Sequence, residues 1–109
     1  MMGNKSVFWT NTARSDLEDI IRYIAEGSVD NAFAVLETLE TKAGSLVTNP
    51  GRGRVVPELS SLGVNHYCEL IENPWRIIYR IESSNVLVVA VLDSRRDLAS
   101  ILLQRLVRS

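Results

Sequence analysis

Six arginines in the second half of the chain could together bind phosphate groups. They are Arg52, Arg54, Arg76, Arg80, Arg95 and Arg96. Glu58, Tyr67 and Glu69 lie near them in sequence and could exchange protons with a substrate. Cleavage of an RNA strand by its own 2′-hydroxyl needs a base, an acid and a group that stabilises charge in the transition state. The alternative, which residue types alone favour, is a solvated sheet face with a few surface ion pairs.

Charge and ligand counts limit the functions that this chain can have. The net charge of −1 argues against a protein whose function is to bind nucleic acid without regard to sequence, because neutralising phosphates requires surplus cations. Residues 1–50 carry four basic and seven acidic groups, a balance of −3, whereas residues 51–109 carry eight and six, a balance of +2. One cysteine, Cys68, and one histidine, His66, are too few for a zinc site or a disulfide. We therefore expect no metal and no cofactor.

Residues 75–81 have the pattern of a strand that positions two of the arginines. Apolar residues alternate with Arg76 and Arg80, which is typical of a strand with one buried face and one face that can carry charge. Trp75 and Tyr79 fall on the apolar side. We expect both aromatic side chains in the core.

Three other segments are expected to be strands. Residues 86–92 are apolar at every position and rich in β-branched side chains, which is typical of an internal strand covered on both faces. This strand would deliver Arg95 and Arg96 to the edge of the sheet. Residues 66–71 precede a turn, and residues 7–9 form a short β-rich segment with Trp9 facing inward.

Two helices are expected between the strand at residues 7–9 and the strand at residues 66–71. Apolar residues recur at helical spacing from 13 to 24 and again from 32 to 47, so each helix has one apolar side. Gly27 can close the first helix, and Ser28 or Asp30 can cap the second. Because the link is so short, the two helices must form an antiparallel hairpin.

The remaining segments are a loop and a final helix. Residues 51–65 contain glycine, proline and serine without periodicity, and we expect a surface loop there. The final helix has a strongly apolar side, and Arg105 and Arg108 complement its C-terminus. Its apolar residues exceed what one face can bury, so we expect a partner to cover some of them; they are Leu98, Ile101, Leu102, Leu103, Leu106 and Val107.

These segments predict one α+β domain spanning residues 1–109, in the order βααβββα, with the helical hairpin packed on a mainly antiparallel sheet. The longest apolar run, residues 86–92, is too short to span a bilayer. We therefore expect a soluble, cytoplasmic protein without a membrane association.

The order of elements, together with four sequence phrases, resembles the RelE/ParE superfamily of type II toxin–antitoxin modules, also known as plasmid stabilisation proteins. The phrases cover nearly the whole chain and are FWTNTARSDLEDIIRYIA, NPGRGRVVPEL, YCELIENPWRIIYRI and VLDSRRDL. The resemblance implies one of two activities. RelE-like members cleave messenger RNA in the ribosomal A site, and ParE-like members poison DNA gyrase; a cognate antitoxin neutralises both.

The residues that match the superfamily favour the ParE-like activity. Arg76 and Arg96 stand where RelE-like nucleases keep phosphate-binding or transition-state arginines. RelE carries a pair of lysines that has no counterpart in residues 66–70 of this chain. The position of the C-terminal tyrosine of RelE corresponds to about Leu102, an apolar residue. Glu58 could serve as a base, but no aromatic residue or histidine follows Arg96. A nuclease without its acid and base loses factors of roughly 10²–10⁴ for each.

We therefore expect a toxin that binds gyrase and forms a hetero-oligomer with its antitoxin. The expected contacts lie on the sheet edge and the final helix and are Arg52, Arg54, Arg80, Arg95, Leu98, Ile101 and Leu102. The alternative is a ribosome-dependent endoribonuclease acting on messenger RNA, with Arg76 and Arg96 as charge stabilisers and Glu58 or Tyr67 as the base. A third possibility is a relic that keeps the fold and antitoxin binding without activity.

Overall fold

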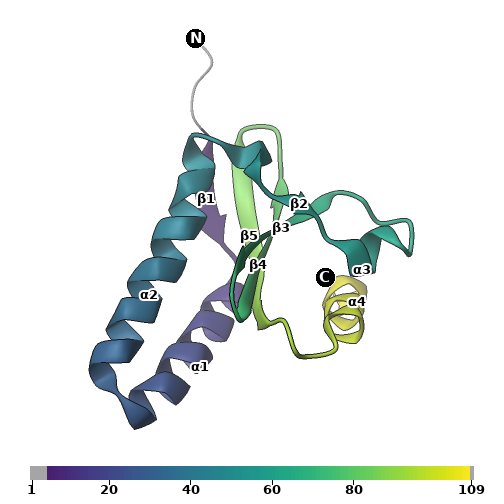
Figure 1. Ribbon diagram of the computed structural model, residues 1–109. Coiled ribbons are helices and arrows are strands. Elements are labelled where there is room, and N and C mark those ends of the chain that lie inside the picture. The colour runs from purple at the N-terminus through teal and green to yellow at the C-terminus, as the bar shows by residue number, and fades with distance from the viewer. Residues whose placement is uncertain (1–4, 109) are drawn as a thin grey trace.

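A five-stranded sheet separates a long helical hairpin from two smaller helices (Figure 1). The structure is a computed structural model that describes residues 5–108, with side chains described for residues 5–105. The strands are β1 (Ser6–Trp9), β2 (Arg54–Val55), β3 (Tyr67–Glu72), β4 (Trp75–Ile81) and β5 (Asn85–Asp93). The helices are α1 (Asn11–Gly27), α2 (Val29–Gly44), α3 (Pro57–Ser60) and α4 (Leu98–Arg108), with short 3₁₀ turns at Ser45–Val47 and Pro50–Arg52.

The observed α+β order confirms the predicted βααβββα pattern, with one correction. Residues 51–65 are not an irregular loop, because they contain β2 and α3. These elements have two and four residues, which is too short for a period of 2 or 3.6 to be recognised in the sequence.

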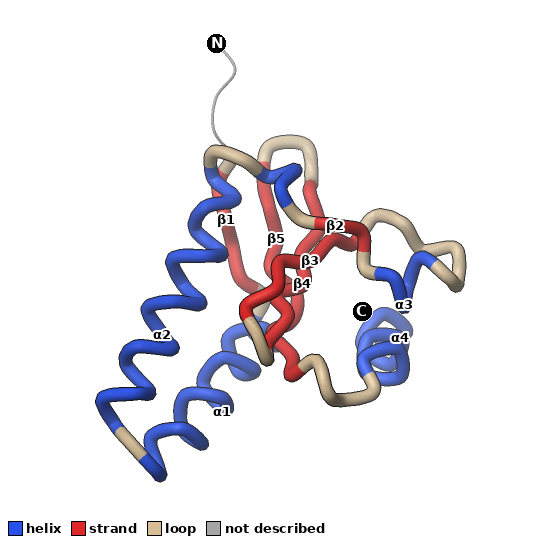
Figure 2. The backbone as a smooth tube through the Cα atoms, in the orientation of Figure 1, coloured by secondary structure: helices blue, strands red, loops and turns tan. Residues whose placement is uncertain are grey.

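The strands lie in the order β1-β5-β4-β3-β2 (Figure 2). β1 pairs parallel with β5, and the other three pairings are antiparallel. β5 has a neighbour on each side, which confirms that the apolar run at 86–92 is an internal strand. A register shift between Ile78 and Tyr79 interrupts the β4–β5 ladder.

A side-chain cap begins each of the two helices of the hairpin. The Thr10 hydroxyl accepts a hydrogen bond from the Ala13 N–H at 3.0 Å and begins α1. Ser28 serves both helices, because its N–H donates to the Ile24 carbonyl and its hydroxyl accepts from the Asn31 N–H at 3.1 Å. Of the two predicted caps, Ser28 is therefore the one that is used, and the hairpin turns at a single residue.

The hairpin packs on the sheet face that carries the odd-numbered residues of β4. Ile77 and Tyr79 are fully buried there, in one cluster with Leu39 of α2 and Leu46 of the 3₁₀ turn that follows α2. Trp9 and Trp75 pack partly buried on the same cluster, which confirms that both tryptophans and Tyr79 face the core.

The opposite face of the sheet is covered by α3 and α4, which corrects the expectation of a solvated face. Ile78 and Leu92 are buried against Leu59 of α3 and against Leu98 and Leu102 of α4. Leu98 and Leu102 are thus core residues and do not form an exposed docking surface. Leu103 is 38% exposed, and the side chains of Leu106, Val107 and Arg108 lie outside the described residues.

Asp16 of α1 ties α4 to the edge of the sheet. β1 pairs with β5 only as far as Val88, so the β5 edge beyond that point lacks a strand partner. There the Asp16 carboxylate accepts a hydrogen bond from the Val91 N–H at 3.0 Å. It also accepts two hydrogen bonds from the Arg105 guanidinium, each 2.8 Å long. Arg105 thus pairs with α1 and is not free to complement the end of its own helix.

We expect Asp16→Ala to lower the free energy of unfolding by about 1–3 kcal/mol, because it leaves the Val91 N–H without its acceptor and Arg105 without its partner. Urea denaturation followed by circular dichroism measures this change. Arg22→Ala is the matched control, because the Arg22–Asp19 pair is exposed on both sides and an exposed pair contributes about 0–1 kcal/mol. Equal effects of the two substitutions would contradict the role given to Asp16.

No helix in the described part of the chain is long and apolar enough to cross a membrane.

Candidate functional site

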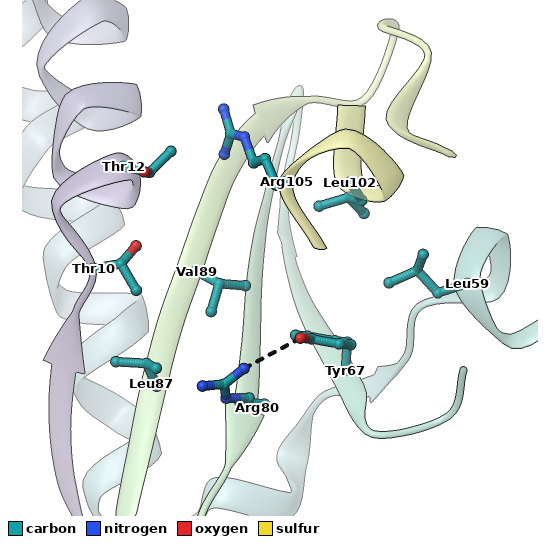
Figure 3. A pocket seen from close by; sticks show the side chains of 9 residues that line it. All are labelled: Thr10, Thr12, Leu59, Tyr67, Arg80, Leu87, Val89, Leu102 and Arg105. Atoms are coloured by element: carbon teal, nitrogen blue, oxygen red, sulfur yellow. Dashed lines mark hydrogen bonds between the residues drawn. The ribbon is translucent and has the colours of Figure 1, made fainter. Parts of the chain in front are cut away.

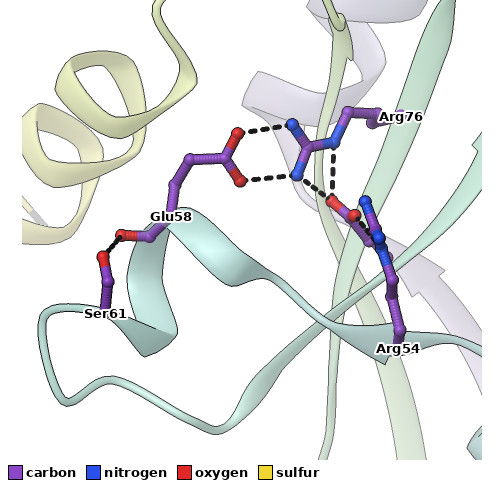
Figure 4. Close-up of polar contacts among 5 residues, drawn as sticks. Arg54, Glu58, Ser61 and Arg76 are labelled. Carbon is purple, nitrogen blue, oxygen red and sulfur yellow. Dashed lines mark hydrogen bonds and ion pairs between the residues drawn. The ribbon is translucent and has the colours of Figure 1, made fainter.

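Four charged residues form a continuous ion network on the sheet face beneath α3 (Figure 4). The Arg76 guanidinium donates two hydrogen bonds to the Glu58 carboxylate, each 2.7 Å long, and one from Nε to Glu69, also 2.7 Å long. Its terminal nitrogen also contacts Glu69. Glu69 accepts in turn from Nε of Arg54 at 2.7 Å. The network therefore alternates in charge, Arg54, Glu69, Arg76, Glu58.

Strand register and one short helix bring these residues together. Arg54 of β2 lies directly opposite Glu69 of β3. Glu69 pairs with Ile78 of β4, so Arg76 is its diagonal neighbour on the same face. Glu58 projects from the first turn of α3 onto the outer side of the guanidinium (Figure 4).

Burial makes this network different from a surface salt bridge. Glu69 is 1% exposed and Arg76 is 6% exposed. The hydrogen bonds from Arg76 hold the pKa of Glu58 below its ordinary value, and those from Glu58 and Glu69 raise the pKa of Arg76. Both shifts favour the charged forms of Glu58 and Arg76, so the bidentate pair between them is an ion pair.

The pairing leaves little capacity for acid–base or phosphate chemistry at Arg76. A guanidinium that is already saturated by two carboxylates cannot bind a phosphate unless Glu58 leaves. Glu58 is a weak base in this setting, because a carboxylate with a lowered pKa takes up a proton less readily. In this geometry Arg76 and Glu58 are paired with each other, so neither is free for phosphate binding or proton transfer.

Tyr67 and Arg80 form a second, separate pair. They lie directly opposite each other on β3 and β4, and Nη1 of Arg80 donates a hydrogen bond to the Tyr67 hydroxyl at 3.2 Å. Nε of Arg80 donates to Glu82 at 2.9 Å. The Tyr67 side chain is 4% exposed, so a substrate could reach its hydroxyl only through the pocket on this face.

The other arginines are not gathered with Arg76. Arg52 donates to the Ser45 hydroxyl at 2.7 Å, in the turns after α2. Arg95 and Arg96 lie in the exposed turn between β5 and α4, and Arg95 pairs there with Asp93. Arg96 has no ion pair with another residue that the structure describes. The six arginines thus do not form one patch.

The Arg95 pair predicts a local pH dependence. Hydrogen bonds from the Arg95 side chain and backbone lower the pKa of Asp93 to about 2. Since the folded-state pKa lies below the unfolded value of roughly 3.9, the pair stabilises the fold above pH ~4, and this contribution is lost as the pH falls toward 2. We expect NMR titration of the carboxyl carbon to give about 2 in the wild type and a value nearer 4 in Arg95→Ala. Solvent screening keeps the contribution of this exposed pair to stability small.

The pocket formed by α1, α4 and the sheet is lined by three residues that the sequence analysis names as site candidates, Tyr67, Arg80 and Leu102, and by others that it does not. Thr10 and Thr12 are not singled out by the sequence analysis, and Arg105 is expected there only to complement a helix end, yet all three line this pocket (Figure 3). No periodicity could have shown this, because the pocket depends on how α4 folds back toward α1. Among the described residues, no group of three or more acidic, histidine or cysteine side chains could hold a metal ion.

Comparison with known proteins identifies the family. A family model described as the ParE toxin of the type II toxin–antitoxin system, parDE, matches residues 7–98. The chain belongs to the ParE toxin family. It is 29% identical over 99 residues to Toxin ParE3 of Caulobacter vibrioides, an alignment that covers 86% of this chain and 91% of that relative. The ParE family is thus supported by sequence independently of the fold.

Two solved toxin–antitoxin structures share the ParE fold. One is the chromosomal ParDE system from P. aeruginosa, with a TM-score of 0.64 and 18% identity, covering 82% of this chain and 95% of that one. The other is the toxin–antitoxin complex RelBE2 from Mycobacterium tuberculosis, with a TM-score of 0.54 and 24% identity, covering 85% and 94%. These likenesses confirm the RelE/ParE fold, and the family match confirms that this chain is on the ParE side and is a toxin of a type II system.

Proposed function

We propose that this ParE-family toxin inhibits growth by binding DNA gyrase, without cleaving RNA, and that a cognate antitoxin neutralises it. The observation that carries the proposal is the ion network. Arg76 is one of the two arginines that the nuclease alternative needs, and Glu58 and Glu69 already pair with it. Inhibition by binding needs no free acid or base, so it is compatible with these groups being occupied.

The test separates the two activities in one preparation. Purified toxin should inhibit supercoiling by gyrase or trap cleaved DNA, while a reporter messenger on translating ribosomes stays intact. Arg96→Ala is the most useful variant, because Arg96 is exposed and its loss should not disturb the core. Gyrase inhibition should persist in that variant. Ribosome-dependent cleavage that falls about 10²-fold or more in Arg96→Ala would establish the nuclease instead.

Truncation before Leu98 is a poor test of gyrase binding. Removing α4 would expose Ile78, Ala90 and Leu92, which it helps to bury, so lost activity would report unfolding. Substitutions at the exposed residues among the expected contacts, Arg52, Arg54 and Arg95, avoid this problem.

The antitoxin partner is supported by the solved relatives, since one is a ParDE system and the other is a RelBE2 toxin–antitoxin complex. Co-expression of the tagged toxin with the product of the adjacent gene should yield a stable hetero-oligomer and restore growth. A toxin that purifies alone from such cells, and that stays toxic, would contradict neutralisation.

A further inference from the structure

A pocket of about 170 Å³ lies on the sheet face beside α4 (Figure 3). Its floor is Leu87 and Val89 of β5, and its walls include Leu59 of α3 and Leu102 of α4. Ala90 and Leu92, farther along β5, are buried beneath α3 and α4, whereas Leu87 and Val89 are only half-buried. The two small helices thus cover one end of this face and leave apolar surface open at the other.

The open surface continues across the sheet as a row of directly paired residues. Phe8 pairs with Leu87, Leu87 with Arg80, and Arg80 with Tyr67, so all four side chains lie on the same face. Phe8 of the edge strand β1 is 53% exposed. An apolar strip therefore leads from the sheet edge into the pocket, with one cation beside it.

Arg80 is the cation that remains available to a partner. Its Nε donates a hydrogen bond to Glu82 and its Nη1 donates one to Tyr67, but its Nη2 makes no hydrogen bond to any residue in the described part of the chain. The side chain is 36% exposed and lines the pocket. Arg105, the other guanidinium at the pocket, gives both terminal nitrogens to Asp16.

We propose that this pocket takes an aliphatic or aromatic side chain of the antitoxin, and that Arg80 pairs with a carboxylate next to that side chain. The inference rests on the proposed neutralisation by an antitoxin and names the chemistry that the antitoxin segment must carry. A cavity of roughly 150 Å³ accepts a benzene-sized group, so the pocket fits one large side chain. Charge complementarity selects an acidic neighbour, and the apolar walls disfavour a nucleic-acid phosphate.

The experiment measures binding of the full toxin to the antitoxin encoded beside its gene, by isothermal titration. Arg80→Met keeps the length of the side chain and removes its charge, and Val89→Phe fills the pocket. Each should weaken binding by about tenfold or more. Arg80→Met should also flatten the dependence on salt. Arg22→Met is the matched control, because Arg22 is exposed on α1 and does not line the pocket; it should leave the affinity unchanged.

A second set of measurements identifies the carboxylate and guards against misfolded variants. Each Asp and Glu in the toxin-binding segment of the antitoxin is changed in turn to Asn or Gln. One of these antitoxin variants should bind wild-type toxin more weakly, but should bind Arg80→Met toxin no more weakly than the unchanged antitoxin does. Thermal melts show whether the variants fold. In NMR spectra of wild-type toxin, the amide signals of Leu87 and Val89 and the Nε signal of Arg80 should shift when the antitoxin is added. This measurement does not depend on any variant being folded.

The outcomes separate the two claims. If the antitoxin does not bind wild-type toxin, the proposed neutralisation fails and this inference fails with it. If the antitoxin binds wild type and both folded pocket variants equally, or binds without shifting the pocket signals, neutralisation stands and the pocket assignment is overturned. Equal binding by every amide variant overturns the pairing with Arg80.

Discussion

Replacing Arg76 by alanine should lower the free energy of unfolding by about 3–5 kcal/mol, the cost of removing one partner from a buried ion pair. Glu69 is 1% exposed and would keep only Arg54, whose own side chain is 61% exposed. Urea denaturation of wild type and variant measures the difference. Arg95→Ala is the control, because the Arg95 side chain is 78% exposed, and its effect should be much smaller than that of Arg76→Ala.

A double substitution distinguishes a lost ion pair from a lost packing contact. Arg76→Met with Glu69→Leu replaces both buried charges by apolar groups and should be much less destabilising than Arg76→Ala alone, because no buried charge is left unpaired. If both variants lose the same free energy, the packing of the Arg76 side chain matters and its charge does not. In either case, lost toxicity in Arg76→Ala has to be checked against its melting curve before it is read as lost catalysis.

Gly53→Ala should destabilise the fold by about 3 kcal/mol, at the upper end of what overpacking costs. A Cβ at this position would lie 2.6 Å from the Glu69 carbonyl oxygen and closer still to the Tyr79 hydroxyl. Neither atom can move easily, because Glu69 is held in β3 and the buried Tyr79 hydroxyl donates to the Pro50 carbonyl at 3.0 Å. The shift in the urea midpoint measures the effect.

Two variants show whether close approach to Tyr79 is the cause. Gly51→Ala is the matched control, since nothing lies within 4 Å of a Cβ there. Tyr79→Phe removes the hydroxyl that accepts from the Gly53 N–H at 3.0 Å and is itself destabilising. The double variant Gly53→Ala with Tyr79→Phe should cost less than the sum of the single changes, because the clash and the hydrogen bond involve the same oxygen. Strict additivity would contradict the explanation.

Long periodic elements could be predicted from the sequence because their burial is written into residue spacing. The stripes of α1 and α2, the alternation in β4 and the apolar run of β5 all appear where expected. The Ser28 cap was one of two candidates, and only the structure distinguishes it from Asp30.

The candidate site could not be predicted in the same way, because it depends on contacts between segments. Arg76 and Arg80 share one strand face, yet Arg76 is buried and Arg80 is half-exposed, since α3 places Glu58 over Arg76. Asp16 falls on the polar side of its helix and looks solvent-facing, although it meets Val91 and Arg105. Alternation indicates which face a residue takes and does not reveal what covers that face.

The parallel pairing of β1 with β5 also determines when a newly made chain can complete its sheet. Ser6 pairs with Asn85 and Trp9 with Val88, partners that are 79 residues apart in each case. The two helices of the hairpin contact each other locally and can form early in synthesis, but β1 has no strand partner until residues 85–88 have been made. Closing so long a loop is slow compared with forming a helix or hairpin. A growing toxin chain on the ribosome therefore acquires the surface that combines Phe8 and Leu87 only after β5 has been synthesised.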